Sequence, residues 1–99
     1  MEVGSKHKAA YSEHLAIVFL LNEGYEVFKN VSQHGIYDLI AIDMDNDKVL
    51  RIDVKSANIS KFGAKYRIKR SQKQISANVT LLYVWFLKEN VKEIELDTN

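Results

Sequence analysis

Two aspartates and a lysine are the residues of this chain best suited to chemistry. Asp38 lies in one run rich in Ile, Val and Leu, and Asp53 and Lys55 lie in the next. A short polar run separates the two, and the three runs are 36–43, 44–47 and 48–55. Apolar runs of this length around a short polar run are typical of a β-hairpin. The sequence therefore predicts that two antiparallel strands carry these side chains.

The register of this hairpin decides whether the two acids meet. If residues 44–47 form the loop, opposed residues have numbers that sum to 91, as those of Asp38 and Asp53 do. Directly opposed residues share a face of the sheet, with Cβ atoms about 4.5–5.5 Å apart. Lys55 points the same way as Asp53 because side chains alternate along a strand. A loop with an odd number of residues would instead turn one Asp to the other face.

Two carboxylates at this separation repel each other, and a divalent cation between them is the simplest explanation. Sites rich in carboxylate oxygens select Mg²⁺ and Mn²⁺. The alternative is structural: Asp53 and Lys55 form a surface ion pair worth about 0–1 kcal/mol, while Asp38 helps to end the turn at Gly35. We favour the metal site because Asp38, Asp53 and Lys55 are all predicted to lie on one face of the same hairpin.

Length and composition limit what the chain can be. It has 99 residues, which predicts a single domain over 1–99 with a core of its own. It has no Cys, which excludes disulfides and thiolate zinc sites. No apolar run reaches the roughly 18 residues that a membrane span needs, and no signal-peptide pattern opens the chain. We therefore expect an intracellular, cytoplasmic protein without a membrane partner.

The net charge of +1 conceals an uneven distribution. No Asp or Glu occurs between Val54 and Lys88, although this stretch is rich in Lys and Arg. Such a stretch next to an acidic site suggests a surface that binds DNA phosphates; the alternative is a solvated basic loop and helix. The residues predicted to contact DNA are Lys61, Lys65, Tyr66, Arg67, Lys69, Arg70 and Lys73.

The remaining elements follow from hydrophobic periodicity. Helices are predicted over 5–22, ending before Gly24, and over 69–78; strands are predicted over 25–31, 80–87 and 91–96; a mobile basic loop is predicted over 56–66. The run 80–87 is apolar throughout, which predicts a strand buried on both faces and central in the sheet. Glu13 is unusual on the apolar stripe of the first helix, because a carboxylate there needs a partner.

The order αβββαβ, with these acids and the D-x-K motif that ends the third strand, resembles the PD-(D/E)XK nuclease superfamily. Within it, the chain is most similar to small archaeal-type Holliday junction resolvases. Asp38 matches the first acid of the motif, Asp53 the second and Lys55 the lysine. Glu13 matches the glutamate of the first helix. Tyr37 stands where the family name has Pro.

The resemblance implies an α/β, restriction-endonuclease-like fold, with a mixed central sheet flanked by helices. It implies a Mg²⁺- or Mn²⁺-dependent DNA endonuclease in DNA recombination or repair. We expect a homodimer, because so small a chain covers one scissile phosphate, whereas a junction or duplex break needs two symmetric cuts. Asp38, Asp53, Glu13 and the carbonyl of Val54 would bind the metal. Accessory residues would be Ser32, where resolvase-like members often carry a serine, and Gln74 or Gln72 on the second helix. The alternatives are a restriction or homing type endonuclease on duplex DNA and a non-catalytic nucleic-acid-binding module.

Overall fold

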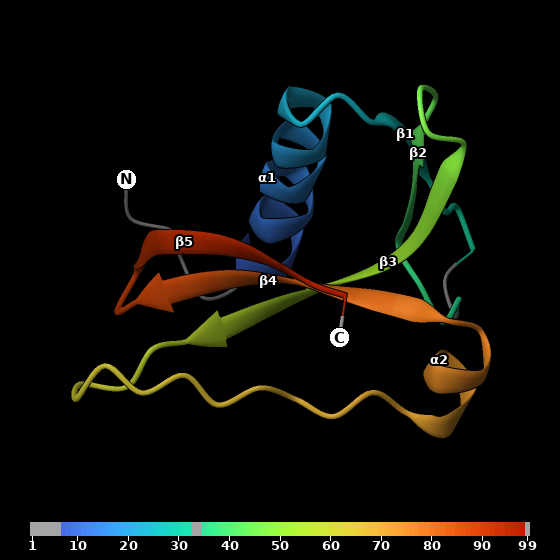
Figure 1. Ribbon diagram of the computed structural model, residues 1–99. Helices are drawn as coiled ribbons and strands as arrows, with labels where there is room; N and C mark the ends of the chain where they lie inside the picture. The colour runs from blue at the N-terminus through green and yellow to red at the C-terminus, as the bar shows by residue number, and fades with distance from the viewer. Residues whose placement is uncertain (1–6, 33–34, 99) are drawn as a thin grey trace.

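One mixed β-sheet carries the fold, and the computed structural model describes it for residues 7–32 and 35–98. The elements are α1 (Lys8–Asn22), β1 (Glu26–Lys29), β2 (Leu39–Asp43), β3 (Lys48–Asn58), α2 (Gln72–Ser76), β4 (Val79–Leu87) and β5 (Asn90–Asp97) (Figure 1). This order is the predicted αβββαβ arrangement followed by the predicted final strand. The α/β fold class is therefore confirmed.

The strands lie in the sheet in their order along the chain, β1-β2-β3-β4-β5. Neighbours are antiparallel except β3 and β4, which are parallel. The prediction that the strand 80–87 is central is wrong, because β3 occupies the middle position. The same strand is nevertheless buried along almost its whole length. The apolar run thus correctly predicted that this strand has neighbours on both sides, but it did not give the position of the strand in the sheet.

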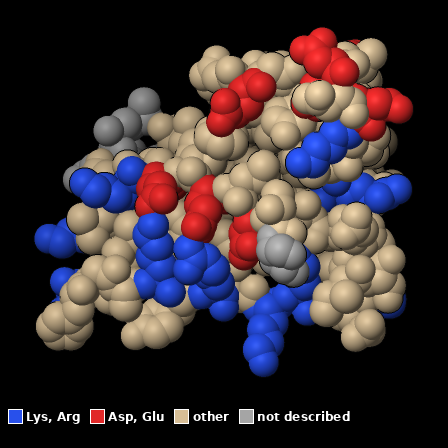
Figure 2. All heavy atoms as spheres, in the orientation of Figure 1, with Lys and Arg blue, Asp and Glu red and all other residues tan. Residues whose placement is uncertain are grey.

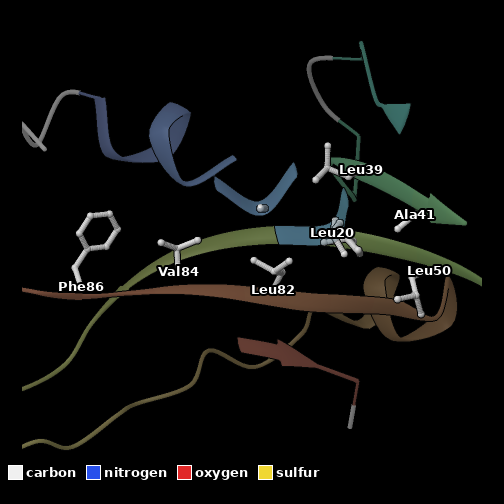
Figure 3. Close-up of a cluster of buried hydrophobic side chains, with 9 residues drawn as sticks. Leu20, Leu39, Ala41, Leu50, Leu82, Val84 and Phe86 are labelled. Atoms are coloured by element: carbon white, nitrogen blue, oxygen red, sulfur yellow. The ribbon is translucent and has the colours of Figure 1, made fainter. Parts of the chain in front are cut away.

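The two faces of the sheet are covered differently, as Figure 1 shows. Helix α1 packs on one face, where Leu20 belongs to a buried cluster with Leu39 and Ala41 from β2 and Leu82 and Val84 from β4 (Figure 3). On the other face Tyr83 and Trp85 stack with ring centroids 5.0 Å apart and are fully buried. Each large side chain buried in this way contributes about 1.5–3 kcal/mol to folding.

Helix α1 ends where its sequence predicts. Gly24 has a φ of +90°, the left-handed conformation that glycine adopts without strain. Its N–H donates to the carbonyl of Leu21, and the N–H of Tyr25 donates to that of Leu20, which is the Schellman pattern. The predicted start of this helix at residue 5 lies outside the described residues. The predicted strand 25–31 is shorter than expected and forms only β1.

The segment 59–71 corrects the prediction of a mobile loop over 56–66. Strand β3 continues to Asn58, and the chain then runs back in extended form beneath the sheet towards α2 (Figure 1). Ile59 bridges Lys65, and the hydroxyl of Tyr83 both accepts from the N–H of Ile68 and donates to its carbonyl. These contacts fix the segment as a strap across β4.

Helix α2 is also shorter than the predicted 69–78. Ser71 caps its start: the Ser71 hydroxyl accepts from the N–H of Gln74, and the Gln74 side chain accepts from the N–H of Ser71. Asn78, with a φ of +57°, follows its end. One short, well-capped turn of helix is therefore what places Gln74 beneath β3.

Candidate active site

The β2–β3 hairpin has the predicted register. The pairs run from Leu39 opposite Ile52 to Asp43 opposite Lys48, so paired numbers sum to 91 throughout. The turn is stabilised by Asp43, whose Oδ1 accepts from the N–H groups of Asp45 and Asn46 at 3.1 and 3.3 Å. The loop length therefore keeps both acids on one face.

Asp38 lies one residue before β2, so the predicted strand 36–43 begins later than expected. Its N–H donates to the carbonyl of Ile52 at 2.7 Å, and its side-chain Oδ2 accepts from the N–H of Val54 at 2.8 Å. The Asp38 carboxylate thus accepts the hydrogen bond that a backbone carbonyl of β2 would accept from Val54 if the pairing of β2 with β3 continued. This anchors Asp38 to β3 by side chain and backbone together.

Asp53 is only 8% exposed and is contacted by two donors. Lys55 Nζ lies 3.2 Å from its Oδ2, and Gln74 Nε2 donates to the same oxygen at 2.7 Å. The Gln74 amide also donates to the carbonyl of Ile36 at 3.1 Å, just before Asp38 in the chain. The structure therefore brings together four of the predicted residues: Asp38, Asp53, Lys55 and Gln74.

Burial and neighbouring charge raise the pKa of Asp38 from 3.8 to about 6. Burial is the largest cause, because it penalises the ionised carboxylate. A hydrogen bond to Asp53 and the charges of Asp53 and Glu13 raise the pKa further, while the N–H of Val54 lowers it. Asp38 thus lies close to Asp53, and its carboxyl changes charge near pH 6 instead of near 3.8.

The Glu13 side chain forms an ion pair with a lysine instead of joining Asp38 and Asp53. Its Oε1 lies 3.1 Å from Nζ of Lys29 on β1, which supplies the partner that its position on the helix requires. Within residues 7–32 and 35–98, no group of three or more His, Cys, Asp or Glu side chains is arranged to hold a metal ion. Two carboxylates therefore meet in this structure, with Glu13 near enough to act on Asp38 through its charge.

The basic strap is less free to bind DNA than its sequence suggests. Lys65 pairs with Glu93, Arg67 Nη2 lies 2.6 Å from Oε2 of Glu95, and Arg70 reaches Asp97 at 3.8 Å. Arg70 also donates to the backbone carbonyls of Val79 and Asp97. Along the strap, Figure 2 shows red and blue side chains in contact. These three cations are matched by the acids of β5.

The other predicted nucleic-acid contacts are open to solvent. Tyr66 is 76% exposed, and Lys61, Lys69 and Lys73 are exposed without a salt bridge among the described residues. Lys61 lies 5.1 Å from the centroid of the Phe62 ring, at the tip of the strap. Any contact of this stretch with DNA would therefore come from these residues first.

A hollow of about 280 Å³ is lined by Phe28 and Ile40 of the sheet and by Asn30, Ser32 and Tyr37 of the segment that leads to Asp38. Asn30 was missed by the sequence analysis. Its amide donates to the carbonyl of Tyr37 at 2.9 Å, and its Oδ1 accepts from the N–H of Ser32. It therefore fixes the chain next to Asp38. An Asn that follows a strand is too common in turns to have signalled this role.

The comparisons with known proteins agree with this geometry. Residues 3–93 match the model of the PD-(D/E)XK endonuclease family. The fold matches the structure of a bacterial homing endonuclease, I-Ssp6803I, with a TM-score of 0.61 and 23% identity over 84% of this chain. The present chain spans 63% of the length of that one. No curated protein sequence matches. No described helix is long and apolar enough to cross a membrane. Because the family model covers nearly the whole sequence, the chain belongs to the PD-(D/E)XK endonuclease family.

Proposed function

We propose that this protein is a Mg²⁺- or Mn²⁺-dependent endonuclease that hydrolyses phosphodiester bonds of DNA. The observation that carries the proposal is the meeting of Asp38 and Asp53 beside the ammonium of Lys55, on one face of one hairpin. Two acids and a lysine in this arrangement match the motif of the family. The exposed side chains of Lys61, Lys69 and Lys73 and the family membership both favour a polyanionic substrate.

The donor set fits a hard divalent cation. The N–H donors that contact Asp38 and Asp53, which come from Val54, Gln74 and Lys55, all lie against an Oδ2 atom. The N–H and C=O of one strand residue point to the same side, so the Val54 carbonyl is directed towards Asp38 as its N–H is. Asp38, Asp53 and this carbonyl would hold the ion, with Glu13 supporting it through water. When bound, such an ion polarises the phosphate and acidifies a water molecule.

The protein's own groups would do the rest. Lys55 would orient the attacking water or neutralise charge that develops on the phosphorane, because its ammonium lies at the rim of the carboxylate pair. Gln74 would hold Asp53 in position through its 2.7 Å hydrogen bond. Asp38, with a pKa of about 6, would ionise fully once a cation faced it.

The test is a cleavage assay on four-way junction, flap, duplex and single-stranded DNA, with Mg²⁺ or with EDTA. We expect Mg²⁺-dependent cleavage that Asp53→Asn abolishes. Glu23→Gln is the matched control, because it removes an exposed acid at the end of α1 and should cleave like the parent. A parent protein that binds DNA but cleaves none of the four substrates would be a nucleic-acid-binding module instead.

The same assay separates the substrate classes. Preference for the four-way junction would indicate a resolvase, as the resemblance in sequence suggests. Preference for duplex DNA would indicate a restriction or homing type enzyme, which the likeness of the fold to a homing endonuclease favours. Cutting both strands of either substrate needs two active sites, so we also propose a two-fold symmetric homodimer. Light scattering of the protein in solution tests the dimer.

A further inference from the structure

Half of one sheet face remains uncovered next to the carboxylates. The strap covers this face over β4, and α2 covers it near Asp53, whereas no described element lies over β1 and β2 on this side (Figure 1). The side chains here are exposed or half-buried: Phe28 of β1 is 48% exposed, and Ile40 of β2 lies beside it in register. The hollow described above opens on this same face.

Arg51 continues this row on β3. It is paired with Ile40 in the register of the hairpin and is exposed. Because residues two apart point to the same side, Arg51, Asp53 and Lys55 lie in line on one face of β3. Their neighbours Leu50 and Ile52 pack into the core beneath α1 on the opposite face, which confirms this alternation.

Arg51 is a cation without a matching acid. It forms no salt bridge with any described residue, whereas Lys65, Arg67 and Arg70 of the strap each face an acid of β5. A guanidinium binds phosphate through two parallel N–H donors, which Lys cannot do. An exposed, unmatched Arg in line with the acids is therefore better placed to grip DNA than the strap is.

Spacing and charge identify what Arg51 would hold. Two residues along a strand span about 6.6 Å, which is of the order of the separation between successive phosphates of one DNA strand. Beyond Arg51 lie the acids of the hairpin turn, Asp45 and Asp47, and Glu26 on β1, which would repel further phosphates. Red side chains gather over this turn in Figure 2. These acids would therefore keep a DNA strand from continuing along β3 past Arg51.

We propose that Arg51 is a positioning residue that binds the phosphate next to the scissile one, and that the substrate strand crosses the uncovered face formed by β1, β2 and β3. This inference rests on the proposed function, because it places the scissile phosphate at Asp38 and Asp53. Arg51 would set which phosphate faces the carboxylates, and the strap would serve as a wall of the site.

The experiment is a double-mutant cycle that combines protein variants with DNA in which one phosphate is neutral. A series of DNA substrates is made, each with a single methylphosphonate at a different position of the substrate strand. The affinity of the protein for each is measured by fluorescence anisotropy with Ca²⁺ in place of Mg²⁺. In the parent, neutralising the contacted phosphate should weaken binding by roughly tenfold, as expected for a charge-assisted contact. Arg51→Ala should weaken binding of unmodified DNA by a similar factor and show no further loss at that one position.

Two further variants complete the design. Arg51→Lys should recover part of the affinity, because the charge returns without the bidentate geometry. Lys92→Ala removes an exposed cation from β5 and should bind like the parent at every position. The proposal would be overturned if each methylphosphonate position lowered the DNA affinity of the parent and of Arg51→Ala by the same factor. Because binding is the readout, this result stands apart from a failure of the parent to cleave DNA, which would count against the proposed function alone.

Discussion

Gln74 Nε2 lies 2.7 Å from Oδ2 of Asp53, and this bond joins α2 to the strand that carries the second acid. The same amide contacts the chain just before Asp38 through the carbonyl of Ile36. One side chain therefore links the two acid-bearing segments. It also caps its own helix, so its removal affects both position and stability.

Gln74→Ala should lower the cleavage rate by at least tenfold and the free energy of unfolding by about 1 kcal/mol, because a helix cap and part-buried hydrogen bonds are lost. Gln72→Ala is the matched control, since Gln72 is an exposed residue of the same helix. Single-turnover cleavage and urea denaturation measure the two effects. A Gln74→Ala variant as active as Gln72→Ala would show that the amide does not position Asp53 for the reaction.

The raised pKa of Asp38 makes the metal-free protein less stable as the pH increases. The folded state holds this proton up to a pH of about 6, whereas the carboxyl ionises near 3.8 without the fold. The resulting stabilisation is fully present below 3.8 and is lost as the pH rises through about 6. Asp38→Asn has no such proton, so this variant should gain stability relative to the parent as the pH rises over that window.

Thermal melts of the parent and Asp38→Asn in EDTA measure this difference. Subtracting one from the other removes the contribution of titrating groups that do not interact with Asp38, such as the carboxyl of Glu95, whose pKa Arg67 lowers. A difference that stays constant between these two pH values would mean that Asp38 is solvated as an ordinary surface acid.

Lys55 is expected to act on the reaction rather than on binding. Lys55→Ala should abolish cleavage and leave the affinity for DNA within a few-fold, because one phosphate contact among several is lost while the charge at the reacting group disappears. Lys92→Ala, which also removes one cation, should retain full activity. Near-parental cleavage by Lys55→Ala would exclude Lys55 as the catalytic lysine.

The acids of β5 should restrain the cations of the strap. Glu93→Gln with Glu95→Gln would release Lys65 and Arg67 and leave a side-chain oxygen to accept from Trp85 Nε1, which now donates to Glu95 at 3.0 Å. We expect tighter, less selective DNA binding and a steeper salt dependence, by up to about 0.9 in log–log slope for each new duplex phosphate contact.

A control for this pair is Glu23→Gln with Asp47→Asn, which removes two exposed acids that form no salt bridge with described residues. Titrations at several salt concentrations compare the two double variants. Equal slopes in both would mean that net charge, and not release of the strap, governs binding.

The hairpin and its acids could be predicted because their signals are local. The polar residues 44–47 fix the loop length, and the loop length fixes the register that brings Asp38 and Asp53 to one face. The continuous apolar run of β4 likewise revealed its burial. Gly24 marked the end of α1 because the Schellman turn needs a left-handed residue.

Other features depend on contacts between distant residues, which a single sequence does not encode locally. The strap looked like a free basic loop because the acids that match it lie on β5, 28 residues further along for Arg67 and Glu95. Glu13 was assigned to the metal shell by resemblance, and its ion pair with Lys29 could not be predicted because Lys29 lies on another element. The middle position of β3 was missed for the same reason, since the parallel pairing of β3 with β4 follows a long connection.

That parallel connection also sets the order in which the molecule can fold. The pairings β1–β2, β2–β3 and β4–β5 are each closed by short links, whereas β3 and β4 pair only after residues 59–78 have crossed the molecule. Long connections close slowly because their entropy is lost before the pairing is gained. We therefore expect Asp53 to acquire Gln74 at the last stage, so that a half-folded chain holds its acids without the amide that positions them. Refolding followed by Trp85 fluorescence and by recovery of cleavage should then give the same slowest rate.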